Sequence, residues 1–268
     1  MSYNRKNIAF VDLGSYWQTM RKICSSHLLT SSKVNSFSSI RRQELGLLVD
    51  RLQEAARNHA IVDLSSQVSS LTFDVICVML FGKKFVDKEL TVAIREGTFL
   101  SGVPNLGDFI PFIAFLDLQG LCRRAKAINK VVDGFLDMII EERPEFKDQN
   151  KTDKDIMIND WAIGQDPSYW TEPQKFNPDR FVDSQIDFIG NNNNFEMLPF
   201  GFGRRGCPGM QLGLVMVRLI VAQLVHCFDW ELPNGVLPSE LDMSEESFGL
   251  TCPRAQNLRV VPICRVCI

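Results

Sequence analysis

Residues 200–209 read FGFGRRGCPG, and a long apolar segment follows them as far as Phe228. Proline is favoured at the first position of a helix, so Pro208 predicts that a helix begins there. Cys207 would then lie beside backbone N–H groups that have no helical partner. Those donors and the positive end of the helix dipole favour a thiolate over a thiol at this position.

The other residues of the same loop suit a flat ligand. Arg204 and Arg205 place positive charge beside the cysteine. Gly203 and Gly206 permit backbone angles that are closed to other residues, and they leave room for a ligand to approach. We expect Phe200 to cover the sulfur and keep water away. A free cysteine by itself is more often a small buried apolar residue, so the whole string carries the indication of a ligand site.

The loop resembles the haem loop of the cytochrome P450 family, Phe-x-x-Gly-x-Arg-x-Cys-x-Gly, with every fixed position filled. The resemblance implies that Cys207 is the axial thiolate ligand of haem iron and the catalytic residue, and that Arg205 binds a haem propionate. Thiolate ligation favours O–O cleavage, which is the chemistry of a monooxygenase. Further contacts to haem b (iron protoporphyrin IX) are implied for four positions of the loop: Phe200, Gly201, Gly203 and Gly209.

A second candidate site lies near the N-terminus, in a helix predicted over residues 15–27. Trp17 and Arg21 are four residues apart, so they share one face of that helix. In most proteins such a pair is only a half-buried aromatic ring that packs under a solvent-exposed arginine side chain. The string GSYWQTMRK also resembles the C helix of plant cytochromes P450. This resemblance implies that both side chains reach a haem propionate.

Composition excludes several other classes of protein. The chain has 268 residues with 45% hydrophobic and 23% charged residues, which is enough for one large domain or two small ones. A net charge of −3 gives no electrostatic basis for binding nucleic acid. The eight cysteines are scattered, which favours a reducing compartment over a disulfide framework. Cys264 and Cys267 form a CxxC pair, so a zinc or redox module at the C-terminus is one hypothesis for the function of this chain, beside the two given below.

We expect no signal peptide and no transmembrane anchor in this chain. The N-terminal ten residues are polar and basic. The longest apolar run, residues 212–228, contains Arg218, Gln223 and His226, and we interpret it as a buried amphipathic helix. Full-length plant relatives are implied to lie on the cytoplasmic face of the endoplasmic reticulum membrane, so membrane association is expected only for such a full-length parent.

The predicted fold class is mainly α with small β-sheets, as a partial cytochrome P450 fold. Asp63 predicts the N-cap of a helix over residues 64–81, and residues 103–116 are predicted to form a loop. Residues 1–268 are expected to form a single incomplete domain in two blocks, 1–157 and 158–268. The remaining expected elements are helices over 36–57, 88–101, 117–143 and 208–228, and strand-like segments within 228–261.

The sequence departs from the family between these two blocks. The distal-helix signature Ala/Gly-Gly-x-Asp/Glu-Thr is absent, and no Glu-x-x-Arg string stands at the expected place of the K helix. The resemblance pairs Arg180, in the string PDRF, with that missing carboxylate. A buried arginine without a carboxylate is costly, so we expect Arg180 to be more exposed or poorly placed.

Two functions follow from these observations. The first is a haem- and iron-dependent monooxygenase of plant secondary metabolism. It would insert one oxygen atom of O2 into a small hydrophobic substrate, with electrons from NADPH delivered by NADPH-cytochrome reductase. The alternative is a non-catalytic product of such an enzyme, from a truncated splice form or a pseudogene. The missing distal helix separates the two, because that helix covers the haem in the family.

Overall fold

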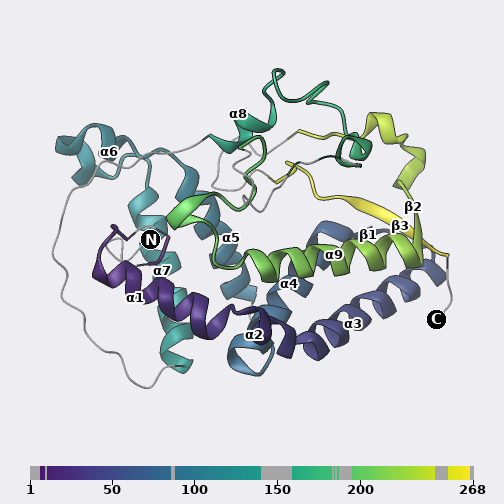
Figure 1. The fold of residues 1–268 in the computed structure, drawn as a ribbon, viewed down its shortest axis with the longest axis horizontal. Helices are drawn as coiled ribbons and strands as arrows, with labels where there is room; N and C mark the ends of the chain where they lie inside the picture. The colour runs from purple at the N-terminus through teal and green to yellow at the C-terminus, as the bar shows by residue number, and fades with distance from the viewer. Residues whose placement is uncertain are drawn as a thin grey trace. The chain divides into compact units, whose positions relative to one another are not determined.

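The computed structural model describes residues 7–9, 11–85, 88–139, 159–182, 184, 186, 195–244 and 253–265. Their helices are α1 (Ser15–Ile23), α2 (Ser31–Ser36), α3 (Ser38–Arg57), α4 (Leu64–Phe81), α5 (Lys88–Gly102), α6 (Leu106–Phe109), α7 (Leu121–Ile139), α8 (Asp160–Gly164) and α9 (Met210–Cys227) (Figure 1). A π-helical turn, Cys24–Leu28, continues α1. The predicted mainly α fold with a small sheet is confirmed.

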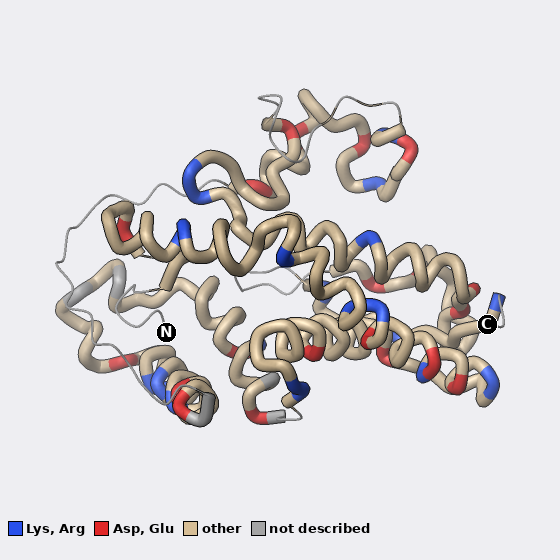
Figure 2. Tube along the Cα trace, turned by 60° about the horizontal axis from the view of Figure 1, so that its bottom comes forward, with Lys and Arg blue, Asp and Glu red and all other residues tan. Residues whose placement is uncertain are grey.

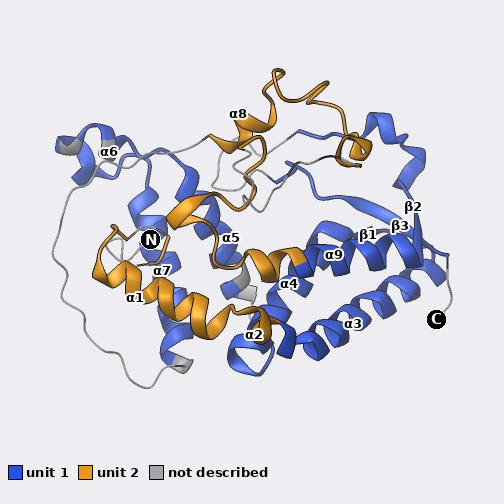
Figure 3. Cartoon of the chain, viewed as in Figure 1, with its two compact units in different colours: residues 1–4, 35–147, 215–268 blue, residues 5–34, 148–214 orange. Residues whose placement is uncertain are grey.

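The chain divides into two compact units (Figure 3). Unit 1 comprises residues 1–4, 35–147 and 215–268, and unit 2 comprises residues 5–34 and 148–214. The division separates residues 5–34 from the rest of the predicted first block and groups them with the segment that contains the haem loop. The prediction of a single domain stays a prediction.

In unit 1, α3 packs against α4 and against a three-stranded antiparallel sheet. The strands are β1 (Val62–Asp63), β2 (Phe228–Glu231) and β3 (Arg259–Cys264), in the order β1-β3-β2. Val62 pairs with Val260, and Phe228 pairs with Cys264. The buried core contains leucines of α3, valines and leucines of α4, and the first residue of β2: Leu48, Leu52, Leu71, Val75 and Phe228.

The predicted limits of α4 agree with the structure. The Asp63 carboxylate accepts a hydrogen bond from the Ser66 backbone N–H at 2.8 Å, which confirms the predicted N-cap. Gly82 ends the helix in the left-handed conformation at φ +72°, which glycine adopts without steric cost. Lys84, beyond that turn, forms an ion pair with the buried Glu44 of α3. The ion pair therefore ties the end of α4 to the helix beside it.

Three predictions about helices need correction. Residues 103–116 contain α6 and a 3-10 helix at Pro111–Leu116 rather than an irregular loop. The helix after the haem loop begins at Met210, two residues later than Pro208 predicted, because residues 208–209 form a turn first. Helix ends commonly shift by this much. The predicted helix over 117–143 begins at Leu121, and its expected end lies beyond the described residues.

The interpretation of α9 as a buried amphipathic helix holds for one face, whereas a second apolar face is exposed. Its buried residues are Met216, Ile220 and Cys227, on one face. Val217, Val221 and Val225 form a second apolar stripe with exposed fractions of 59%, 53% and 57%. By length and composition α4 and α9 could each cross a membrane. That is weak support for a span, because core helices of soluble proteins pass the same test.

The charged residues follow the expectation from composition. Basic and acidic residues are interspersed along the described chain (Figure 2). No group of three or more His, Cys, Asp or Glu side chains among the described residues could hold a metal ion. Cys264 ends β3, whereas Cys267, the other residue of the predicted CxxC pair, lies outside the described residues.

Candidate functional site

All predicted haem contacts fall within unit 2, although they come from two distant parts of the sequence. Trp17 and Arg21 lie on α1, and the other six lie in the loop that precedes α9. The structure thus brings the N-terminal pair and the cysteine loop into one compact unit. This grouping agrees with the role that the family resemblance assigns to both.

The loop closes on itself by backbone hydrogen bonds. The Cys207 N–H donates to the Phe200 carbonyl at 2.7 Å, and the Gly206 N–H donates to the Gly203 carbonyl at 3.1 Å. Gly201 and Gly203 have φ of +66° and +68°, in the left-handed region that favours glycine. A 3-10 turn begins at Gly203 and ends at Arg205, two residues before the cysteine. The glycines are therefore required by the backbone path of the loop.

Cys207 is exposed and lies three residues before the first residue of α9. The Phe200 ring lies against the helix, because a Cβ atom placed at Gly213 would be 3.4 Å from its Cε1 atom. The shielding of the sulfur by Phe200 stays a prediction. A Cβ atom at Gly209 would lie 3.8 Å from Cys207 Sγ, so this glycine keeps one side of the sulfur open.

Arg205 joins the loop to the N-terminal segment. Its Nη2 group donates to the Val11 carbonyl at 2.7 Å, and Nη1 donates to the Ala9 carbonyl at 3.3 Å. Its guanidinium carbon also lies 5.5 Å from the centre of the Trp17 ring, within cation–π range. Trp17 is buried, with 7% of its surface exposed. The predicted neighbourhood of Arg205 and Trp17 is thus present.

Arg21 lies one turn after Trp17, and its Nη1 group donates to the Gly206 carbonyl. The two helix residues therefore face the same loop, one through a ring contact and one through a hydrogen bond. The carbonyls of Ala9, Val11 and Gly206 accept these hydrogen bonds, and the sequence could not predict that. Every residue has a backbone carbonyl, and the type of side chain does not show which carbonyls will be acceptors.

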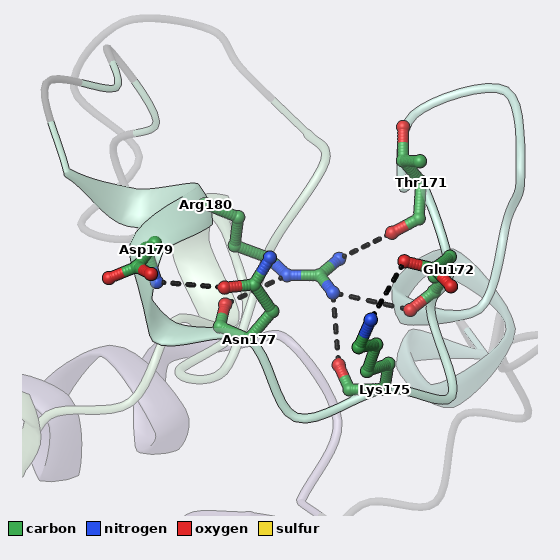
Figure 4. Close-up of polar contacts among 6 residues, drawn as sticks. All are labelled: Thr171, Glu172, Lys175, Asn177, Asp179 and Arg180. Carbon is green, nitrogen blue, oxygen red and sulfur yellow. Dashed lines mark hydrogen bonds and ion pairs between the residues drawn. The ribbon is translucent and has the colours of Figure 1, made fainter.

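Arg180 illustrates a contact that the sequence did not reveal. Its guanidinium donates four hydrogen bonds of 2.9–3.2 Å to backbone carbonyls (Figure 4). The acceptors belong to Thr171, Glu172, Lys175 and Asn177. Arg180 was expected to be more exposed or poorly placed without its carboxylate; it is half-buried, and the four carbonyls satisfy its guanidinium in the place of that missing carboxylate.

A cavity of about 570 Å³ adjoins this arginine within unit 2, and Trp170, Phe181 and Met197 line part of it. A second cavity of about 190 Å³ lies between the end of α3 and β3 in unit 1. Neither is lined by a predicted haem contact. Cys207 itself is exposed.

The residues present fit the proximal side of a haem group. An exposed thiol can reach iron, the glycine loop presents little side-chain bulk, and Arg21 and Arg205 offer cations to carboxylates. Arginine binds a carboxylate through a planar fork of N–H groups.

Comparisons with known proteins identify the family of the chain. The family model described as "Cytochrome P450" matches residues 1–157 and 150–258. Cytochrome P450 CYP736A12 of Panax ginseng is 29% identical over 391 aligned positions, which cover 98% of this chain and 78% of that protein. Cytochrome P450 71D7 of Solanum chacoense is 26% identical, covering 97% and 77%, and premnaspirodiene oxygenase of Hyoscyamus muticus is 27% identical, covering 97% and 76%.

The alignment to the ginseng protein is longer than this chain. Its 391 positions exceed the roughly 263 residues that 98% of 268 supplies, so about 128 positions of the relative have no counterpart here. The family model also matches in two segments that meet near residues 150–157. Both findings agree with the internal departure between the two predicted blocks. The two matched segments together span nearly the whole chain, which therefore belongs to the cytochrome P450 family of haem-thiolate monooxygenases.

Proposed function

We propose that this chain binds haem b with Cys207 as the axial ligand of the iron. The observation that carries the proposal is the convergence on one loop of the exposed Cys207 with Arg205, Arg21 and Trp17, from α1 and the haem motif. Arg205 and Arg21 would hold the propionates by charge-assisted hydrogen bonds. The indole of Trp17 would lie beside them and keep Arg205 in place.

When bound, a haem with thiolate ligation supplies the activation of O2 for insertion of one oxygen atom into a substrate. The residues of this chain contribute binding and orientation. Gly201 and Gly203 hold the loop in a conformation that presents the cysteine. The Phe200 carbonyl accepts from the Cys207 N–H and so holds the backbone of Cys207 against the start of the loop.

The reaction that we propose is oxygenation of a small hydrophobic plant secondary metabolite. Electrons would come from NADPH through NADPH-cytochrome reductase at the endoplasmic reticulum membrane, as expected for a full-length plant relative. The name premnaspirodiene oxygenase, carried by one relative, supports an apolar substrate. Kinship supports the broad class of substrate in this proposal, and the residues around Cys207 support the binding of haem.

A second candidate function is a non-catalytic form of such an enzyme. Two observations favour it: about 128 positions of the ginseng relative have no counterpart, and the α9 stripe of Val217, Val221 and Val225 is exposed. Exposed apolar patches mark surfaces that another element usually covers. In this form the chain would keep the haem loop and lack the part that covers the opposite face of the haem.

A carbon-monoxide difference spectrum of the reduced, haem-reconstituted chain tests the proposal. We expect a Soret band at the long wavelength typical of thiolate ligation. Cys207→Ala should remove this band, whereas the matched control Cys122→Ala, which changes an exposed cysteine of α7, should retain it. A long-wavelength band that is equal in the wild type and in Cys207→Ala would contradict the assignment.

Turnover separates the two candidate functions once the spectrum is known. The long-wavelength band together with oxygenated product, in the presence of reductase and NADPH, would support the enzyme. The same band with NADPH consumption but no product over a panel of terpenoid and phenylpropanoid substrates would support the non-catalytic form.

A further inference from the structure

The peptide group that joins Gly206 to Cys207 is hydrogen-bonded on both sides. Its carbonyl oxygen accepts from Arg21 Nη1, and its N–H donates to the Phe200 carbonyl at 2.7 Å. The two partners come from different parts of the chain, since Arg21 lies on α1 and Phe200 begins the loop. This peptide directly precedes the Cα atom that carries the Cys207 side chain.

We propose that Arg21 is a positioning residue for Cys207, acting through the Gly206 carbonyl. A peptide group is planar, so holding its oxygen on one side and its N–H on the other fixes the plane from which the Cys207 side chain projects. A hydrogen bond from a guanidinium is roughly twice as strong as one between neutral groups. The proposal rests on the proposed function, because positioning the sulfur matters for its bond to iron.

Arg21 is well supported for this role. It is partly buried, and it follows Trp17 by one turn of α1. Trp17 is itself buried and covered by the Arg205 guanidinium at 5.5 Å. Contacts therefore run in both directions, from the loop to α1 through Arg205 and from α1 to the loop through Arg21.

Gly206 is the residue that permits the close path of this loop. A Cβ atom at position 206 would lie 3.2 Å from the Gly203 carbonyl oxygen, closer than side chains normally approach. With glycine there, the loop can turn tightly and direct the Gly206 carbonyl to the Arg21 guanidinium. The hydrogen bond thus depends on both partners being the residue types that the sequence has.

A propionate contact by Arg21 is compatible with this role, because a guanidinium carries five N–H donors. The two roles predict different measurements, however. A propionate ligand changes the affinity for haem and leaves the haem-free loop as it was. A positioning residue changes the loop even when no haem is present, and it changes the ligation state of iron when haem is bound.

Hydrogen exchange of the Cys207 amide in the haem-free chain of 268 residues tests the positioning role directly. Arg21→Met keeps much of the apolar stem and removes the donors. We expect exchange of the Cys207 amide to become about tenfold faster, as for loss of one hydrogen bond. Lys22→Met, on the next residue of α1, is the matched control and should stay within about twofold of the wild type.

Two further measurements keep the test sound if Arg21→Met perturbs α1 itself. The amide of Leu48, in the core of unit 1, serves as an internal standard for global stability. Arg21→Lys retains a positive charge and a donor with a different reach, so an intermediate exchange rate is expected. Unchanged exchange of the Cys207 amide in Arg21→Met, with α1 intact, would overturn the positioning role.

The spectrum with haem gives a second, independent readout. At saturating haem we expect Arg21→Met to show a smaller thiolate-type share of the carbon-monoxide Soret band, in addition to any loss of affinity for haem from a missing propionate contact. A weaker affinity with an unchanged band would assign Arg21 to the propionate alone and overturn the inference. If the wild type binds no haem, the proposed function fails, while the exchange experiment still decides whether Arg21 holds the loop.

Discussion

Replacing Arg180 by methionine should loosen residues 171–181 while the rest of the chain stays folded. The variant removes four hydrogen bonds from the guanidinium to backbone carbonyls and keeps most of the apolar stem. A hydrogen bond contributes about 0.5–1.5 kcal/mol net. Since this arginine is partly exposed, the lower value applies, and four bonds amount to about 2 kcal/mol.

Hydrogen exchange of two nearby amides measures that loss. The Lys175 N–H donates to the Glu172 carbonyl at 2.9 Å, and the Val182 N–H donates to the Asp179 carbonyl at 3.0 Å. A loss of about 2 kcal/mol predicts that both amides exchange roughly thirtyfold faster in Arg180→Met. The fluorescence of the buried Trp170 should change as well, because the centre of its ring lies 6.0 Å from the guanidinium carbon of Arg180.

The matched control is Lys175→Met in the same loop (Figure 4). Lys175 pairs with Glu172 at 3.4 Å, and both side chains are 64% exposed. Such a surface pair contributes about 0–1 kcal/mol, so exchange at Val182 should change by less than about threefold. Exchange at Val182 in Arg180→Met that is no faster than in this control would refute the reasoning that the four carbonyls replace the missing carboxylate.

Three further substitutions test other parts of the fold. Asp63→Ala should lower the free energy of unfolding by about 1 kcal/mol in urea titration, because it removes the N-cap of α4, and Asp63→Asn should retain most of it; equal losses would argue against the cap. On α9, Ile220→Ala should cost about 2–5 kcal/mol and Val221→Ala less than about 0.5 kcal/mol, because only the former is buried; equal costs would show that the exposed stripe is covered in solution. The hydrogen bond from Arg265 holds the pKa of Asp229 below its usual range. The ionised Asp229 therefore stabilises the folded state at neutral pH, and this stabilisation is lost as the pH falls through the lowered pKa. Asp229→Asn should thus reduce the fall of the urea midpoint on the acid side, and an unchanged slope would contradict this.

Much of the candidate site could be predicted from the sequence. The motif around Cys207 has a fixed spacing of residue types, and the match of the family model agrees with it. The shared face of Trp17 and Arg21 follows from helical periodicity, and the structure places both against the same loop. The limits of α4 followed from a capping aspartate before the helix and a glycine after it.

The surroundings of α9 and the partners of two arginines could not be predicted in this way. An apolar helix has the same sequence whether its second face is covered or exposed, so Val221 gave no sign of its exposure. Likewise, Arg180 and Arg205 bind backbone carbonyls, which every residue carries. Such contacts depend on how the chain turns in space.

The sequence by itself determined the family motif around Cys207 and the presence of the main helices. Side-chain chemistry and helical periodicity depend only on residues that are close in the sequence, so both can be predicted from it. Only the tertiary structure decided that α1 meets the haem loop through Arg21 and the Gly206 carbonyl, and that Arg180 is satisfied without a carboxylate. Arg21 and Gly206 are far apart in the sequence, and the carbonyls that bind Arg180 look like any other backbone carbonyl. Whether such groups form a hydrogen bond depends on their distance and direction in space.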